Sequence, residues 1–142
     1  MPLSRDEDIG ALLTGTRRIA MIGASAKPDR LSHGVMHFLL DHGWQVIPVN
    51  PGLAGQTILG QPVVASLSDI HPPVDLVDIF RSSDAAGEAV DEAIAHGARA
   101  VWLQLGVINA DAAARAEAAG LQVVMDHCPK IEIRRLGISG PA

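Results

Sequence analysis

Short, largely apolar runs alternate with amphipathic helical patterns along most of this chain, and this alternation constrains the fold more than any other feature. Apolar residues at consecutive positions are typical of strands that are buried on both faces of a sheet. Five such runs are present, at residues 19–22, 45–49, 75–80, 100–105 and 121–125. Strands of this kind, separated by helices, predict a parallel sheet with right-handed crossovers and helices on both faces.

The spacing of apolar residues predicts four helices around these strands. Ser4 and Glu7 have capping-box spacing, so we expect a short N-terminal helix at about 4–15 that lies against the sheet. The other expected helices cover residues 34–40, 85–96 and 110–119. Residues 52–74 hold no long helical pattern. We therefore expect one Rossmann-like, doubly wound α/β domain over residues 1–142, with a parallel sheet of about five strands in three α/β/α layers.

Composition excludes several classes of function. The net charge is -5 and aromatic residues make up 3% of the chain, so the basic surface and stacking side chains of a nucleic-acid-binding protein are missing. A single cysteine, Cys128, excludes an internal disulfide. The first nine residues are polar where a secretory signal needs an apolar run, and no apolar stretch approaches the roughly 20 residues of a membrane-spanning helix. We expect a cytoplasmic protein that partners neither nucleic acid nor membrane.

The turns after the expected strands form the candidate ligand site, because open parallel sheets bind ligands at the carboxyl ends of their strands. The first turn, Gly23-Ala24-Ser25, combines a glycine that lets the backbone approach a ligand with a hydroxyl and a following helix N-terminus. A side chain at Gly23 is expected to occupy the position of a bound anion. Lys27 and Arg30 add two cations to an acidic chain, so the pattern favours a phosphorylated ligand. The alternative is a glycine turn in a solvated basic loop.

Two common phosphate-binding fingerprints are missing from this turn. A dinucleotide-binding fold reads G-x-G-x-x-G and places an acidic residue at the end of the second strand, whereas this chain has Ser25, Pro28 and Val49-Asn50-Pro51 at those places. The Walker pattern G-x-x-x-x-G-K-[ST] is absent as well. An NAD(P)-dependent oxidoreductase with a degenerate phosphate loop stays open as an alternative function.

Five short blocks follow one another in order along the expected strands, and together they resemble one family. The blocks are Gly23-Ala24-Ser25 with Lys27-Pro28, Pro48-Val49-Asn50-Pro51, Phe80-Arg81, Val101-Trp102-Leu103-Gln104-Leu105-Gly106 and Asp126-x-Cys128. The set resembles the small stand-alone CoA-binding proteins, which are similar to the N-terminal CoA-binding domain of the succinyl-CoA synthetase alpha subunit and of ADP-forming acyl-CoA synthetases. The resemblance runs from about Arg18 to Leu136 and implies coenzyme A or an acyl-CoA as the small-molecule ligand.

The same resemblance implies a role for each candidate residue. For the nucleotide, the implied contacts are Gly23, Ala24 and Ser25 with the pyrophosphate, Lys27 or Arg30 with the phosphates, Asn50 and Pro51 with the adenosine, and Phe80, Arg81 and Ser82 as the residues that close over it. For the pantetheine arm, the implied neighbours are Gln104 and Gly106, with the thiol toward Cys128.

Two departures from the family pattern limit what the resemblance implies. Synthetase domains commonly carry a lysine directly after the Asn-Pro pair, whereas Gly52-Leu53-Ala54 is uncharged, so the 3′-phosphate depends on Lys27 or Arg30. The length leaves no room for the second half of a synthetase with its phosphorylated histidine. We therefore expect a protein that is non-catalytic alone and that sequesters, senses or presents its ligand.

The sequence leaves further alternatives open. Cys128 follows Asp126 and His127 at a strand end, where a neighbouring imidazolium favours a thiolate, so a thiol-redox protein is a third hypothesis beside inert packing. His33 and His37 have helical metal spacing but no further ligand, so no metal is expected. No pair of catalytic acids or bases emerges from the spacing. A protein partner or a homo-oligomer is compatible with the pattern.

Overall fold

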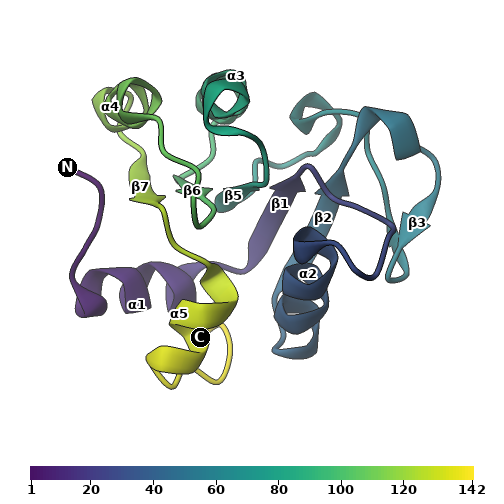
Figure 1. Ribbon diagram of the computed structural model, residues 1–142, viewed down its shortest axis with the longest axis horizontal. Coiled ribbons are helices and arrows are strands. Elements are labelled where there is room, and N and C mark those ends of the chain that lie inside the picture. Colours follow the sequence, from purple (N-terminus) through teal and green to yellow (C-terminus); the bar gives the residue numbers. More distant parts are fainter.

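Five parallel strands form the central sheet, in the order β2-β1-β5-β6-β7 (Figure 1). The computed structural model describes all 142 residues. The strands are β1 Arg18–Ile22, β2 Gln45–Val49, β5 Leu76–Ile79, β6 Ala100–Leu103 and β7 Gln122–Met125. β1 pairs with β2 on one side and with β5 on the other, so the chain moves outward in two opposite directions. The expected Rossmann-like, doubly wound α/β fold is confirmed.

Helices cover both faces of the sheet and complete three layers (Figure 1). Their bounds are α1 Asp6–Gly15, α2 Leu31–Asp41, α3 Ser83–His96, α4 Ala110–Ala118 and α5 Pro129–Arg135. α3 and α4 lie on one face, and α1, α2 and α5 lie on the other. Each strand sends alternate side chains into two buried clusters of 21 and 20 residues, which is why the strands read as continuous apolar runs. Val101 belongs to the cluster under α3 and α4, and its neighbour Trp102 belongs to the other.

The segment between β2 and β5 contains only short elements, as the missing helical pattern predicts. These are the 3-10 turns η1 Pro51–Leu53 and η2 Leu67–Asp69 and the antiparallel strands β3 Thr57–Ile58 and β4 Gln61–Pro62. Val64 forms an isolated bridge with Val49, the last residue of β2. The segment is therefore anchored at the carboxyl end of the outer strand.

The structure corrects the expected starts of two helices. α1 begins at Asp6 with Arg5 as its N-cap and without a side-chain capping bond, so the spacing after Ser4 does not mark a capping box. α2 begins at Leu31, earlier than the expected start at Gly34. The composition of residues 23–33, which are rich in glycine, serine, proline and charge, resembles a loop and hid the first turn of the helix.

α5 is a helix that the apolar pattern does not indicate. Its signals in the sequence are Pro129 at its first position and two arginines, Arg134 and Arg135, in its last turn. Arg135 forms an ion pair with Asp6 of α1, with 2.7 Å between Nη2 and Oδ1. α5 thus covers the sheet together with α1 and α2, below the carboxyl end of β7 (Figure 1).

Candidate ligand-binding site

The strand order reverses between β1 and β5, which places a crevice at the carboxyl ends of these two strands. Ile22 and Ile79, the last residues of the two strands, are partners in the ladder. The turn after β1 leads to α2, and the turn after β5 leads to α3 on the opposite face (Figure 1). The crevice therefore lies between the N-terminal ends of two helices.

Gly23 closes β1 in the left-handed region, with a φ of 84°. Its N–H donates to the carbonyl oxygen of Val49 at 3.2 Å, which ties the turn to the end of β2. A Cβ atom at this position would lie 2.1 Å from the carbonyl oxygen of Phe80. Glycine is required here by a close approach between two backbone segments of the protein. The expectation that a side chain at Gly23 would occupy the anion position is wrong, because that side chain would first meet the Phe80 backbone.

Six backbone N–H groups between the end of β1 and the first turn of α2 have no protein acceptor. They belong to Ala24, Ser25, Ala26, Asp29, Leu31 and Ser32. The Ser25 hydroxyl oxygen accepts the N–H of Lys27 at 3.1 Å, which closes a local turn in the loop. Unpaired N–H groups at a helix N-terminus, with the positive end of the helix dipole behind them, form an anion site.

A cavity of about 370 Å³, hereafter the first cavity, opens over this turn on the α2 side of the crevice. The candidate residues that line it are Gly23, Ala24, Ser25, Lys27, Arg30, Asn50 and Phe80. Lys27 and Arg30 are exposed, and neither forms an ion pair within the chain. Leu31 and Ser32 line the cavity as well, and the sequence analysis missed them because α2 begins earlier than expected.

Asn50 uses both ends of its side-chain amide within the protein. Nδ2 donates to the carbonyl oxygen of Ala24 at 2.8 Å, and Oδ1 accepts the N–H of Gly52 at 2.9 Å. The side chain thus joins the end of β2 to the turn after β1 and caps η1. In this structure Asn50 positions the turn, while its exposed edge forms part of the wall of the first cavity.

A second cavity, of about 150 Å³, lies on the α3 side of the same crevice. Pro51 and Arg81 line it, together with apolar residues at the ends of β1 and β2. Two carboxylates of α3, Glu88 and Glu92, also line it, and their spacing of four residues on one helix face is the signal that could have identified them. Ser82 is the N-cap of α3, and its hydroxyl oxygen accepts an N–H of the first turn at 3.3 Å. The candidates are thus divided between the two sides of the crevice.

Four of the candidates line neither cavity: Ser82, which caps α3, and Gln104, Gly106 and Cys128. Gly106 is exposed, and its N–H donates to Oδ1 of Asp126 at 2.7 Å. Gln104 and Cys128 are enclosed in the layer beneath the carboxyl edge, with 2% and 4% of their surfaces exposed. Cys128 is the N-cap of α5 and packs into the apolar cluster that α1, α2 and α5 cover. This burial favours the packing interpretation of the thiol over the redox one.

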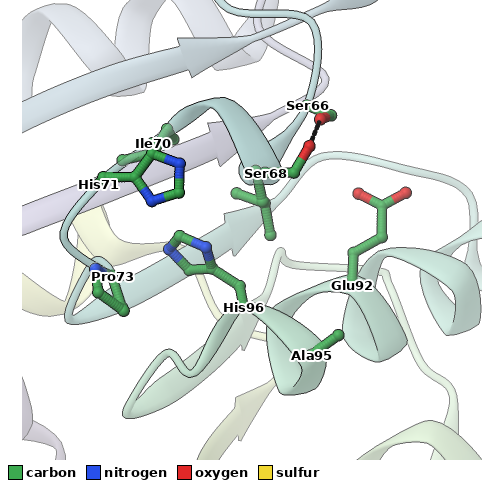
Figure 2. A pocket seen from close by; sticks show the side chains of 9 residues that line it. Ser66, Ser68, Ile70, His71, Pro73, Glu92, Ala95 and His96 are labelled. Carbon is green, nitrogen blue, oxygen red and sulfur yellow. Dashed lines mark hydrogen bonds between the residues drawn. The ribbon is translucent and has the colours of Figure 1, made fainter.

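The largest cavity, about 490 Å³, adjoins the second cavity at Ser66 and Glu92 and extends between η2 and the C-terminal half of α3. Figure 2 shows His71 and His96 facing one another at one end of this third cavity, with Ser66, Ser68 and Glu92 toward the other. Nε2 of His96 accepts the N–H of Val74 at 3.0 Å, and burial lowers the pKa of His96, with further lowering by its charged neighbours. The adjoining helix end is the negative end of the α3 dipole, so this cavity is unsuited to an anion.

Two kinds of structural feature, a cluster of metal ligands and a membrane-spanning helix, are missing from this chain. No group of three or more His, Cys, Asp or Glu side chains is placed to hold a metal ion. Nδ1 of His37 faces Oδ2 of Asp41 at 3.2 Å, one turn along α2. No helix combines the length and the apolar character that crossing a membrane requires.

The comparison with known proteins assigns a family. The family model described as a CoA binding domain matches residues 17–134, which is most of the chain. The chain belongs to the family of CoA-binding domains. The Bacillus subtilis (strain 168) protein YneT is 36% identical over 124 residues, covering 87% of this chain and 90% of YneT. The residues that the family model matches, 17–134, agree with the extent from about Arg18 to Leu136 that the sequence blocks indicate.

Solved structures of similar proteins show the same fold. A protein of Pyrococcus horikoshii OT3 superposes with a TM-score of 0.89 at 39% identity, over 96% of each chain. The dinucleotide-forming acetyl-coenzyme A synthetase 1 of Ca. Korarchaeum cryptofilum superposes with a TM-score of 0.69 at 21% identity, over 80% of this chain and 27% of the synthetase. The likeness to the synthetase concerns the fold alone.

Proposed function

We propose that this protein binds coenzyme A or an acyl-CoA in the crevice between β1 and β5 and is non-catalytic alone. The observation that carries the proposal is the turn after β1, where unpaired N–H groups lie beside the unpaired cations Lys27 and Arg30. Membership in the family of CoA-binding domains supports coenzyme A in particular. The residues present fit such a ligand, because a diphosphate matches clustered N–H donors and cations.

The division of the crevice suggests how the ligand is placed. The pyrophosphate would lie on the N–H groups of residues 24–26 in the first cavity, with Lys27 and Arg30 beside it. The adenosine would lie toward the second cavity, against Pro51 and Arg81. Arg81 offers on this side the positive charge that the segment after Pro51 lacks, so it is a third candidate for the 3′-phosphate.

NAD(P) binding is the second candidate function, and one observation favours it. Glu88 and Glu92 bring carboxylates to the second cavity, where an acidic side chain can accept hydrogen bonds from ribose hydroxyls. The carboxylate that a dinucleotide-binding fold places at the end of β2 is missing, because Asn50 stands there. We therefore rank coenzyme A above NAD(P).

Isothermal titration calorimetry with coenzyme A, NAD+ and NADPH at one salt concentration tests the proposal. We expect saturable binding of coenzyme A and no measurable heat from the two nicotinamide cofactors. Native mass spectrometry of the protein as purified adds an independent readout, since a ligand that co-purifies is identified by its mass. Saturation by NADPH, with no response to coenzyme A, would favour the oxidoreductase hypothesis instead.

A further inference from the structure

Asp78 and Gln104 are two enclosed polar side chains whose hydrogen-bonding atoms have no partner in the protein. Their exposed fractions are 0% and 2%, and both side-chain oxygens of Asp78, together with Oε1 and Nε2 of Gln104, are unbonded. Buried polar atoms are almost always hydrogen-bonded, because each unmade bond costs free energy. Two unpartnered side chains in one protein layer therefore indicate that something outside the chain bonds to them.

The two side chains lie on the same face of neighbouring strands, close to the carboxyl edge. Asp78 of β5 is the ladder partner of Trp102 of β6, and Gln104 follows two residues later on that same face. Phe80 follows Asp78 by two residues and lines the first cavity. From the first cavity toward the middle of the sheet, the order is therefore Phe80, then Gln104 beside it, then Asp78.

The surroundings of the two side chains define the chemistry that they recognise. Met21 and Trp102, the ladder partners of Asp78 on the two adjacent strands, are both buried in the apolar cluster on this face. Burial raises the pKa of Asp78 well above its ordinary value and so favours the neutral carboxyl, which can both donate and accept a hydrogen bond. The Gln104 amide also donates and accepts. An uncharged group with its own donor and acceptor, such as a secondary amide, matches this pair, whereas a carboxylate does not.

We propose that Asp78 is a binding residue of this protein: together with Gln104, which the family resemblance already places beside the pantetheine arm, it binds the amides of that arm of coenzyme A. The inference rests on the proposed function and extends it from the nucleotide to the arm. The arm would pass from the first cavity beneath Phe80, whose side chain must turn aside because both polar groups are enclosed. An acyl group that ends in a carboxylate would be disfavoured at this position.

A comparison of two ligands isolates the arm. Coenzyme A carries the nucleotide and the arm, whereas adenosine 3′,5′-bisphosphate carries the nucleotide without the arm. We expect Asp78→Leu and Gln104→Met to weaken coenzyme A about tenfold, as expected for one lost buried hydrogen bond each, and to leave the bisphosphate within twofold of its wild-type affinity. Asp78→Asn retains a donor and an acceptor, so it should keep coenzyme A affinity within about threefold.

Controls separate loss of the arm site from general damage. Val77→Ala removes buried volume from the opposite face of β5 and should leave both affinities unchanged. If wild type binds neither ligand, the proposed function itself fails. If wild type binds coenzyme A and Asp78→Leu binds it equally well, or if both ligands weaken in parallel in that variant, the arm inference is overturned while the nucleotide site stands.

Discussion

The cavities at the two ends of the sheet differ in the charges and hydrogen-bond donors that line them, and this difference does not follow their size. The third cavity, near His71 and His96, is the largest, yet it adjoins a helix C-terminus and the ring of His96 is already bonded to the backbone. The first cavity is smaller, but N–H groups without acceptors, exposed cations and a helix N-terminus face it. Unsatisfied donors and charge, rather than volume, therefore mark where an anionic ligand binds.

The largest effect is expected from Gly23→Val, which tests whether the turn at the carboxyl edge is built by backbone contact. The new side chain would meet the Phe80 carbonyl and be forced into the left-handed region, so we expect a loss of about 3 kcal/mol or more of unfolding free energy. Urea unfolding of the wild type and of Gly23→Val measures this loss of free energy.

Gly120→Val is the matched control for this substitution. Its φ is 90°, but no atom lies within 4 Å of the position that a Cβ would take. The Gly120→Val protein therefore has the backbone strain without a steric clash, and we expect it to lose about 1 to 2 kcal/mol of unfolding free energy. Equal losses in the two variants would contradict the close approach at Gly23.

The next largest effect concerns charge at the carboxyl edge. Replacing Lys27 and Arg30 together with alanine removes both cations of the first cavity, and we expect coenzyme A affinity to fall about ten- to hundredfold. The dependence of affinity on salt should also become shallower. Calorimetry at two salt concentrations checks both effects.

Arg99→Gln is the control for the charge removal. Arg99 is an exposed arginine directly before β6, at the opposite edge of the sheet. This variant should bind coenzyme A like the wild type. A loss in Arg99→Gln as large as that in the double variant would show that net charge, rather than the site, sets the affinity.

Asp78 predicts a pH dependence of stability for the buried layer beneath the carboxyl edge. Its folded pKa is raised above the unfolded value of about 3.9, so the folded state binds the proton more tightly. The stability that this group contributes is complete below pH of about 4 and is lost as the pH rises toward the folded pKa, by about 1.4 kcal/mol per pH unit at most. We expect the Asp78→Asn protein to lose less stability than the wild type when urea unfolding is compared from pH 4 to 8. If the unfolding free energies of the two proteins changed with pH in parallel, the Asp78 carboxyl would be ionised in the folded protein.

His96 at the third cavity should show the opposite sign and the smallest effect. Its folded pKa is lowered, so the stability that it contributes is present above the unfolded pKa of about 6.5 and is lost as the pH falls. Because the ring is partly exposed, we expect the difference from His96→Gln between pH 7 and 5 to stay well below about 1 kcal/mol. If the wild type instead lost more unfolding free energy than His96→Gln as the pH rises above 7, the lowered pKa of His96 would be contradicted.

The sequence predicts the layers well because each strand is buried on both faces, so its apolar run is unbroken. The start of α2 and the whole of α5 were not predicted, because residues 23–33 have the composition of a loop and α5 carries only capping signals. Spacing along the chain does not single out Asp78. Its significance depends on its ladder partner in β6 and on the lack of a hydrogen-bond partner, which only the folded sheet reveals.

The arrangement of the candidate site could likewise not be predicted in full from the sequence. The five blocks identify the residues at the carboxyl edge, but not that Pro51 and Arg81 face α3 while Lys27 and Arg30 face α2. That division follows from the opposite crossovers after β1 and β5. The role of Asn50 as the link between two turns likewise depends on atoms that are 26 residues apart in the chain.

Backbone amide chemical shifts during a titration with coenzyme A test the central claim most directly. We predict that the ¹⁵N–¹H resonances of Ala24, Ser25 and Ala26 shift most, because their N–H groups gain the phosphate oxygens as acceptors, while those of His71 and His96 stay in place. Saturable shifts around His71 and His96, with the turn after β1 unchanged, would contradict the account.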